Sequence, residues 1–174
     1  MSITINPPPG QWTVNDLDRI PDVGLRVELH EGNLLIMSPA TMWHSKTIRR
    51  ITSALESQQL PAEMEVGVKR SDYNTRIADV AVFAKPQTDS RRAHWLPEEL
   101  SVVIEVVSDS SDDADHHEKP RWYAAAGIPE FWRVERADDD ADAVIFQFRL
   151  ATTADGESAY VQTGVTTLSA LETR

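Results

Sequence analysis

The 174-residue chain is 41% hydrophobic and 26% charged, which excludes a disordered tail, and no apolar run approaches the roughly 20 residues that cross a bilayer. It has no cysteine, which excludes disulfides and thiolate metal sites and favours a cytoplasmic protein whose metals are held by oxygen or imidazole ligands. The formal net charge of −11 argues against a general nucleic-acid coat protein, because such proteins bind through basic side chains, although it leaves room for a local basic patch.

Three elements are predicted before the core. Residues 1–11 contain three consecutive prolines, which favour an extended lead on the surface. Residues 13–20 have the spacing of a short helix with a capping box at its start. Two apolar runs, 26–30 and 33–37, flank a Glu-Gly pair and predict a β-hairpin.

A helix is expected to follow from Ser38, which can serve as its N-cap with Pro39 in the first turn. At helical spacing, one face of this helix carries His44, Ile48, Ile51 and Leu55. His44 therefore points inward. It could approach substrate or a carboxylate there, but an inward histidine near a helix start is more often a packing residue whose hydrogen bonds are satisfied.

Three strands come next. Residues 64–69 alternate as a strand with one solvent-exposed face, and residues 76–83 form a largely apolar strand with Asp79 at its opening end. The polar loop 85–99 has the composition of a flap or a basic edge. Residues 101–108 then form a strand that is apolar on both faces except for one glutamate.

That glutamate, Glu105, needs an explanation. An ionised carboxylate buried without a partner costs several kcal/mol, so we expect a metal, a cation or an open pocket beside it. The alternative is a half-exposed position at the end of the strand, next to an arginine.

A second helix is predicted from Asp115 through Lys119 and Tyr123 to Gly127, which suits a left-handed C-cap. The acidic and histidine-rich residues 112–118 at its entry are explained by capping and the helix dipole more simply than by a second metal site. A strand at 130–134 and a hairpin made by 144–150 and 158–162 complete the chain.

The central elements, about residues 38–135, thus run in the order αβββαβ, with a hairpin added at each end. We expect one α/β (α+β) domain over residues 1–174. Asp79 and Glu105 could converge at adjacent strand ends, and two carboxylates without cysteine favour Mg²⁺ or Mn²⁺. Such a site supports phosphoryl transfer, which a nearby lysine would assist.

Several ordered motifs resemble a known family. They are Arg76-Ile77-Ala78-Asp79-Val80, then Val103-Ile104-Glu105-Val106-Val107-Ser108, and then Asp115 with Lys119, Tyr123 and the run 126–132. Together with residues 27–32, 37–39 and His44, they are similar to the putative restriction endonuclease family of the PD-(D/E)XK nuclease superfamily, over roughly residues 12 to 150.

The resemblance implies a restriction-endonuclease-like core, with a four-stranded mixed sheet between helices and a divalent-metal nuclease site. In that site Asp79 and Glu105 would be metal ligands, and the backbone carbonyl of Val106 could be a further one. The resemblance also puts Glu28 near the metal, whereas the hairpin pattern by itself slightly favours a solvent-facing glutamate. Tyr123 is expected in the core, one turn from Lys119.

Two features depart from the superfamily pattern. The lysine expected two residues after the acidic residue is replaced by Val107, and the resemblance implies that Lys119 supplies that role from the next helix. Pro120 directly follows Lys119, and a capping box at Asp115 would put this proline just beyond the tolerant first turn, where it would kink the backbone that aims the lysine.

We therefore expect an Mg²⁺- or Mn²⁺-dependent endonuclease that hydrolyses DNA phosphodiester bonds, with Asp79 and Glu105 binding metal and Lys119 assisting the attacking water. One alternative is hydrolysis of another phosphoester at the same site. The other is a non-catalytic binding or assembly module with the nuclease fold. A homodimer is a reasonable expectation, because cutting two strands suits two sites.

Overall fold

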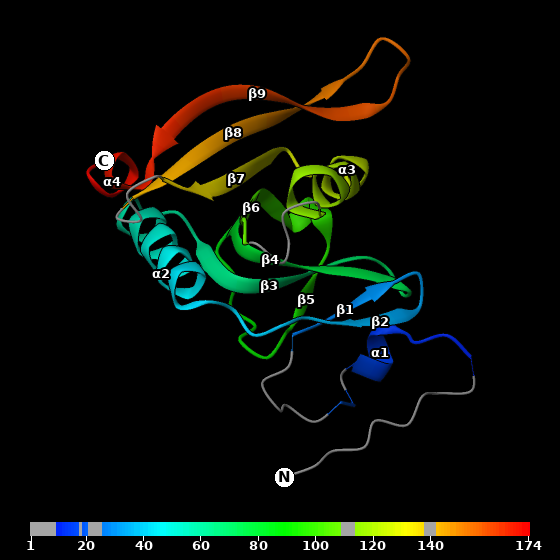
Figure 1. Cartoon of the computed structure of the whole chain (residues 1–174). Helices are drawn as coiled ribbons and strands as arrows, with labels where there is room; N and C mark the ends of the chain where they lie inside the picture. Colours follow the sequence, from blue (N-terminus) through cyan, green and yellow to red (C-terminus); the bar gives the residue numbers. More distant parts are fainter. Residues whose placement is uncertain (1–9, 18, 21–25, 109–113, 138–141) are drawn as a thin grey trace.

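The computed structural model describes residues 10–17, 19–20, 26–108, 114–137 and 142–174. Its centre is a mixed nine-stranded sheet in the order β2-β1-β4-β6-β7-β8-β9, with β3 paired to β4 and the short β5 paired to β3 (Figure 1). The strands are β1 Val27–His30, β2 Asn33–Ile36, β3 Ala62–Ser71, β4 Asn74–Phe83, β5 His94–Trp95, β6 Leu100–Val106, β7 Glu130–Arg136, β8 Ala143–Thr152 and β9 Ser158–Thr167.

Four α-helices accompany the sheet in the described residues: α1 Val14–Leu17, α2 Met42–Ser57, α3 Lys119–Ala125 and α4 Leu168–Glu172. A 3-10 turn at Pro97–Glu99 precedes β6, and a π-helical turn at Ala114–Glu118 leads into α3. Within the described part of the chain, no helix is both long enough and apolar enough to cross a membrane.

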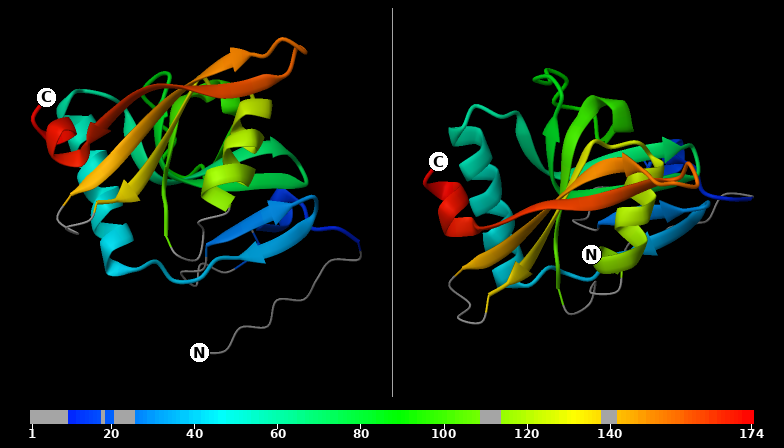
Figure 2. Two further views of the ribbon diagram at one scale, coloured as in Figure 1. Left: turned by 45° about the horizontal axis from the view of Figure 1, so that its top comes forward. Right: turned by 90° about the horizontal axis from the view of Figure 1, so that it is seen from above.

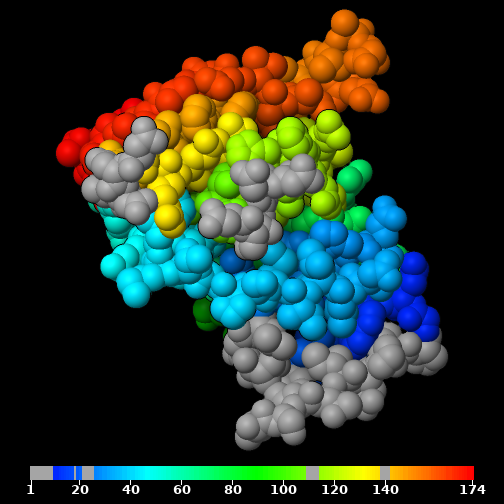
Figure 3. Space-filling model, viewed as in Figure 1, coloured from blue at the N-terminus to red at the C-terminus, as the bar shows by residue number. Residues whose placement is uncertain are grey.

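The expected α/β class is confirmed, and the sheet is larger than the four strands that the resemblance implies. Among strands and α-helices, the run α2, β3, β4, β6, α3, β7 is interrupted in the described residues by the two-residue β5 alone. Both hairpins join this sheet, because β1 pairs with β4 and β8 pairs with β7. The tip of the β8–β9 hairpin projects beyond the rest of the molecule (Figures 1 and 3).

The two faces of the sheet are covered by different helices (Figure 2). On one face, α2 and α4 pack in an apolar cluster that includes Ile51, Leu171 and Ile104. On the other, α3 packs through Tyr123 against a cluster that includes Val103. Side chains alternate between faces along each strand, so β4 and β6 contribute to both clusters.

Pairing along β4 positions the candidate site. Strand β3 pairs with β4 along nearly its whole length, so β1 and β6 must share the other edge of β4. Thr75 of β4 pairs with Leu29 of β1, and Val80 of β4 pairs with Ile104 of β6. A gap between two neighbouring strands therefore opens beside the middle of β4.

Several local expectations need correction. Helix α2 begins at Met42 with Thr41 as its N-cap, not at Ser38, because the Thr41 hydroxyl accepts a hydrogen bond from the backbone N–H of His44. Asp79 lies in the middle of β4 and not at its opening end. Part of the loop 85–99 is strand β5, which pairs in parallel with β3.

Both turn predictions that depend on left-handed backbone are confirmed. Glu31 and Gly32 have φ of 51° and 78° and close the β1–β2 hairpin, as a type I′ turn requires. Gly127 has φ of 82° at the end of α3, where its N–H donates to the Ala124 carbonyl. The predicted lead at residues 1–9 lies outside the described residues.

Candidate active site

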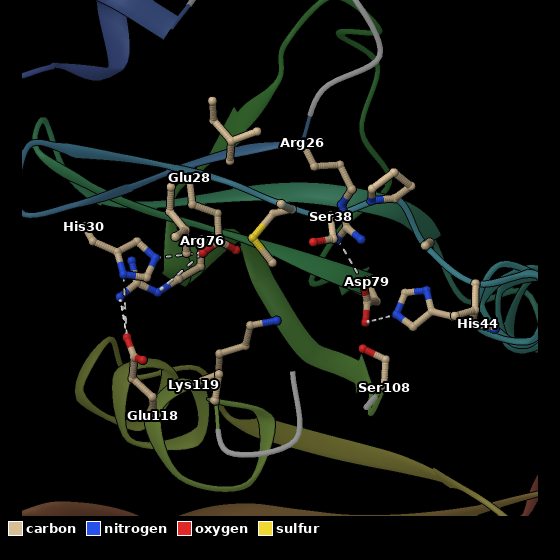
Figure 4. Close-up of a pocket in the computed structure, with 17 residues that line it drawn as sticks. Arg26, Glu28, His30, Ser38, His44, Arg76, Asp79, Ser108, Glu118 and Lys119 are labelled. Carbon is tan, nitrogen blue, oxygen red and sulfur yellow. Dashed lines mark hydrogen bonds and ion pairs between the residues drawn. The ribbon is translucent and has the colours of Figure 1, made fainter. Parts of the chain in front are cut away.

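The candidate site lies in the gap between β1 and β6, where side chains replace part of the strand ladder. The backbone N–H of Ile77 donates to Glu28 Oε1 at 2.9 Å, and the N–H of Val106 donates to Asp79 Oδ2 at 2.9 Å. A pocket of about 250 Å³ opens here and is lined by residues of both hairpin strands, α2, β4 and α3 (Figure 4). The fold thus brings the carboxylates of Glu28 and Asp79 into the lining of one pocket.

Asp79 is buried and held from three sides. Its Oδ1 accepts a hydrogen bond from Arg26 at 2.9 Å, while Oδ2 contacts His44 Nε2 at 3.1 Å in addition to the Val106 N–H. Burial alone would raise the pKa of Asp79, but His44, Lys119 and Arg26 bring this pKa well below its usual range. Asp79 is therefore an anion in the folded protein.

Glu105 is fully buried on β6, beside Asp79. Its Oε1 accepts a hydrogen bond from the Tyr123 hydroxyl at 2.6 Å, and its Oε2 accepts one from Lys119 Nζ at 2.7 Å. Burial raises the pKa of Glu105 well above its usual value; Lys119 opposes this shift, whereas Asp79 and Asp115 add to it. Burial and the Glu105 charge also raise the pKa of Tyr123, so its hydroxyl stays protonated and donates.

Lys119 is the cation at the centre of the site. Its Nζ lies 2.7 Å from Glu105 Oε2 and 3.0 Å from Asp115 Oδ1. Burial would lower the pKa of Lys119, but the charges of Glu105, Asp115, Asp79 and Glu28 outweigh burial and raise it. The ammonium is therefore charged and is oriented by carboxylates from several elements.

Pro120 does not disturb this lysine. The π-helical turn ends at Glu118, so α3 begins at Lys119 and Pro120 falls in its first turn. Glu118 also has helical backbone, so the π-helical turn and α3 form one continuous helical segment. The expectation that Pro120 would misdirect Lys119 is wrong, because the Lys119 Nζ still reaches Glu105 and Asp115.

Glu28 is 1% exposed, so the solvent-facing interpretation of this residue is wrong. Its Oε2 lies 2.9 Å from His30 Nε2 and 3.8 Å from Arg76 Nε. Burial would raise the pKa of Glu28, but His30, Lys119, the Ile77 N–H and Arg76 lower it. The hairpin pattern misleads because β1 separates from β4 at Glu28. The side chain of Glu28 therefore faces the gap between β1 and β6 and lines the pocket, although the pattern predicts that it faces water.

The site contains every buried Asp, Glu, Lys or Arg side chain of the described residues, together with the buried His44. The six are Glu28, Arg76, Asp79, Glu105, Asp115 and Lys119. Four carboxylates thus accompany two buried cations, with Arg26 beside Asp79 at 19% side-chain exposure. Four of the six line the pocket, and Glu105 and Asp115 lie behind Lys119. Because buried charge costs free energy unless it is compensated, such a concentration beside one pocket indicates a functional site.

The donor set fits a hard divalent cation. Carboxylate oxygens are the ligands that Mg²⁺ and Mn²⁺ prefer, and the excess of negative charge would be relieved by a divalent ion. Across the described residues, however, no three His, Cys, Asp or Glu side chains are close enough to form a ready-made metal cage. The arrangement suits an ion held by two carboxylates, a backbone carbonyl and water.

The structure brings all six sequence-predicted side chains to this site: Glu28, His44, Asp79, Glu105, Lys119 and Tyr123. The sequence interpretation missed Arg26, Arg76 and Asp115. Two of them left a usable signal. Arg76 begins an otherwise apolar run and needs a buried partner, and Asp115 stands four residues before Lys119, the spacing of an ion pair on one helix face. Asp112 and Asp113 lie outside the described residues.

Comparisons with known proteins bear on the family and the fold. A family model described as Uma2, putative restriction endonuclease, matches residues 14–169. A solved structure described as a putative nuclease belonging to DUF820, from Anabaena variabilis, is similar with a TM-score of 0.61 and 15% identity. The similarity covers 92% of this chain and 97% of that one, and at this identity it shows a shared fold. No curated protein gives a significant match.

Proposed function

The chain belongs to the putative restriction endonuclease family, and from this premise we propose that it is an Mg²⁺- or Mn²⁺-dependent endonuclease that hydrolyses DNA phosphodiester bonds. One observation carries the proposal. Asp79 and Glu105, from neighbouring strands, meet in the one cluster that holds all the buried charge of the described residues. Burying these charges costs desolvation free energy, and a protein that only needed to fold would be at least as stable with apolar side chains in their place.

Asp79 and Glu105 would hold the ion, and the Val106 carbonyl could be a further ligand. When bound, a divalent ion lowers the pKa of the attacking water and neutralises charge on the phosphate. His44 and Arg26 keep Asp79 ionised and fix both of its oxygens. Tyr123 orients Glu105 through its hydroxyl.

Lys119 would contact the reacting groups directly. Its ammonium lines the same pocket as Asp79, so it can donate a hydrogen bond to the attacking water or to a phosphate oxygen. For this it must share its protons between Glu105 and substrate. A lysine from a helix can do this as well as one from a strand, because the requirement is only that its tip reach the water.

A cleavage assay tests the proposal. Wild-type protein should cleave DNA in Mg²⁺ or Mn²⁺ and not in EDTA, and Glu105→Ala and Asp79→Asn should lower the rate by at least about 100-fold. The control variant is Glu63→Ala, which removes an exposed carboxylate on β3 and should cleave like wild type. Equal cleavage by wild type and Glu105→Ala would mean that the activity comes from a contaminant.

The non-catalytic module is a second candidate, which one observation favours. Both oxygens of Glu105 already accept hydrogen bonds from Lys119 and Tyr123, so the cluster is satisfied to a large extent without an ion. If the protein is such a module, Mn²⁺ would not bind, and substitution of Glu105 would leave the binding of its partner intact. A panel of other phosphoesters separates DNA cleavage from a related hydrolysis.

The homodimer also remains a proposal, because cleavage of both strands of a duplex suits two copies of the site. Sedimentation equilibrium of the wild-type protein should then give a mass twice that of one chain. A monomer mass at every concentration would contradict it.

A further inference from the structure

A second hollow lies on the other side of the π-helical turn and α3 from the candidate active site. Lys119 lines the active-site pocket, whereas the next two residues, Pro120 and Arg121, line the second hollow. The second hollow has a volume of about 250 Å³ and is walled on its far side by β7, β8 and β9. In Figure 1, α3 lies beside the half of the β8–β9 hairpin that is nearer its tip.

The lining of this hollow is unlike the rest of the acidic chain. Among the described residues it includes two arginines, two histidines and two half-buried aromatic rings, and no carboxylate: Arg121, Arg133, His116, His117, Phe148 and Tyr160. The active-site pocket, by contrast, is lined by Glu28, Asp79 and Glu118. In a chain with a net charge of −11, a lining with two arginines, two imidazoles and aromatic rings favours an anionic ligand with flat rings.

A third hollow connects the two. Its lining includes Thr41 and Ser108, which also line the active-site pocket, and His116, which also lines the second hollow. Trp43, Arg136 and Glu135 also line the third hollow, and Glu135 pairs with His116 and Arg133. The three hollows therefore adjoin one another, and we call the second and third together the side groove.

Arginine and aromatic side chains are stacked along this side groove. The Arg136 guanidinium lies 4.7 Å from the centre of the Trp43 ring, and Arg133 lies 5.5 Å from the centre of the Phe148 ring. Rows of aromatic rings with nearby cations are the surfaces on which single-stranded nucleic acids bind, since each base presents a flat face and each phosphate a charge. Bases in a duplex are already stacked on one another and cannot use such a surface.

We propose that the side groove binds a single-stranded stretch of the substrate beside the scissile phosphate. The inference rests on the proposed nuclease function and narrows its substrate to a single strand, or to a duplex with a single-stranded arm. Arg121 contacts a phosphate of that stretch. Phe148 and Tyr160 receive an unpaired base.

Binding can be measured without cleavage. Fluorescence anisotropy in EDTA would compare a labelled single strand of about 20 nucleotides with a blunt duplex of the same sequence. The single strand should bind at least about tenfold more tightly. Arg121→Glu should weaken this binding about tenfold and lower the salt dependence by about one ion, as expected for one phosphate contact. Arg70→Glu, an equal charge reversal at an exposed position on β3, should stay close to wild type.

Phe148→Leu tests the base contact separately, because leucine keeps the apolar packing against Phe131 but lacks the aromatic face. Single-strand affinity should fall about tenfold with an unchanged melting temperature. Equal affinities for strand and duplex would overturn the inference, and so would wild-type binding by Arg121→Glu or by Phe148→Leu. In each of those cases the cleavage assay still tests the proposed nuclease function separately. A wild-type protein that neither binds nor cleaves the single strand or the duplex would contradict both proposals.

Discussion

The two faces of strands β4 and β6 bury different kinds of side chain. Toward α2 and α4, the two strands present only aliphatic side chains: Val80, Val82, Ile104 and Val106. On the face that α3 covers, the same strands present Ala81 and Val103 and then, next to the gap, Asp79 and Glu105, where His44 of α2 also reaches Asp79. Both faces belong to the same backbone, so they differ only in the side chains that point toward each of them.

The comparison shows how one sheet can be both a scaffold and a reactive surface. The aliphatic face stabilises the fold in proportion to the apolar area that it removes from water. The charged face costs desolvation free energy, which the ion pairs offset only while every partner is present. Substitutions on the aliphatic face should therefore change stability alone, whereas substitutions on the charged face should change both stability and activity.

The largest effect is expected for Lys119→Met in the metal-free protein. It would leave Glu105 and Asp115 buried without their cation and should lower the free energy of unfolding by about 3–5 kcal/mol in urea titrations near neutral pH. Lys46→Met, on the exposed side of α2, is the matched control and should change it by less than about 0.5 kcal/mol. Similar small losses in both variants would mean that the charged face carries no such cost.

Tyr123→Phe should have an intermediate effect. The hydroxyl donates to a buried carboxylate at 2.6 Å, and loss of such a bond costs about 1.5–3 kcal/mol. Tyr73→Phe, on the exposed β3–β4 turn, should be nearly neutral in the same denaturant titration. If Tyr123→Phe is equally neutral, Glu105 does not depend on this hydroxyl.

Ile104→Val tests the aliphatic face. One buried methylene group is lost, which should lower the free energy of unfolding by about 0.5–1.5 kcal/mol. Cleavage measured well below the melting temperature should be unchanged, although Ile104 is the immediate neighbour of Glu105. A rate loss as large as that of Glu105→Ala would break the division between the faces.

The smallest effect is a pH dependence of stability in the metal-free protein. The pKa of Glu105 is raised above 4.5 by burial, so its stabilising proton is fully present below that pH and is lost as the pH rises. The pKa of Asp79 lies below 3.8, so its contribution is present above that pH and is lost as the pH falls. Glu105→Gln should therefore gain stability relative to wild type as the pH rises from about 5 to about 8. Asp79→Asn should show no such rising gain, and a flat difference for Glu105→Gln would contradict the raised pKa.

Periodicity in the sequence was enough to predict most of the fold. The inward face of α2, the Glu31-Gly32 hairpin and the C-cap at Gly127 follow from local rules and are confirmed. The start of α2 was misjudged because Ser38-Pro39 and Thr41 both offer a plausible cap, and only the path of the chain out of β2 decides between them. The size of the sheet depends on edge pairing between distant strands, which no local pattern encodes.

The site was predictable where a residue conflicts with its own element. Glu105 stands in an apolar strand, and that conflict indicated a partner from the sequence alone. Glu28 and Asp115 conflict with nothing locally, since a strand glutamate facing water and an aspartate at a helix start are both common. Their burial results from the gap beside β4 and from the π-helical turn, which are properties of the tertiary structure.

The central claim is that Asp79 and Glu105 hold a divalent ion, and Mn²⁺ binding measured by electron paramagnetic resonance tests it most directly. Wild-type protein should bind Mn²⁺, and Asp79→Asn and Glu105→Gln should each weaken binding by at least about tenfold, while Glu63→Gln stays at wild-type affinity. Equal Mn²⁺ binding by all four proteins, or none by the wild type, would contradict the account.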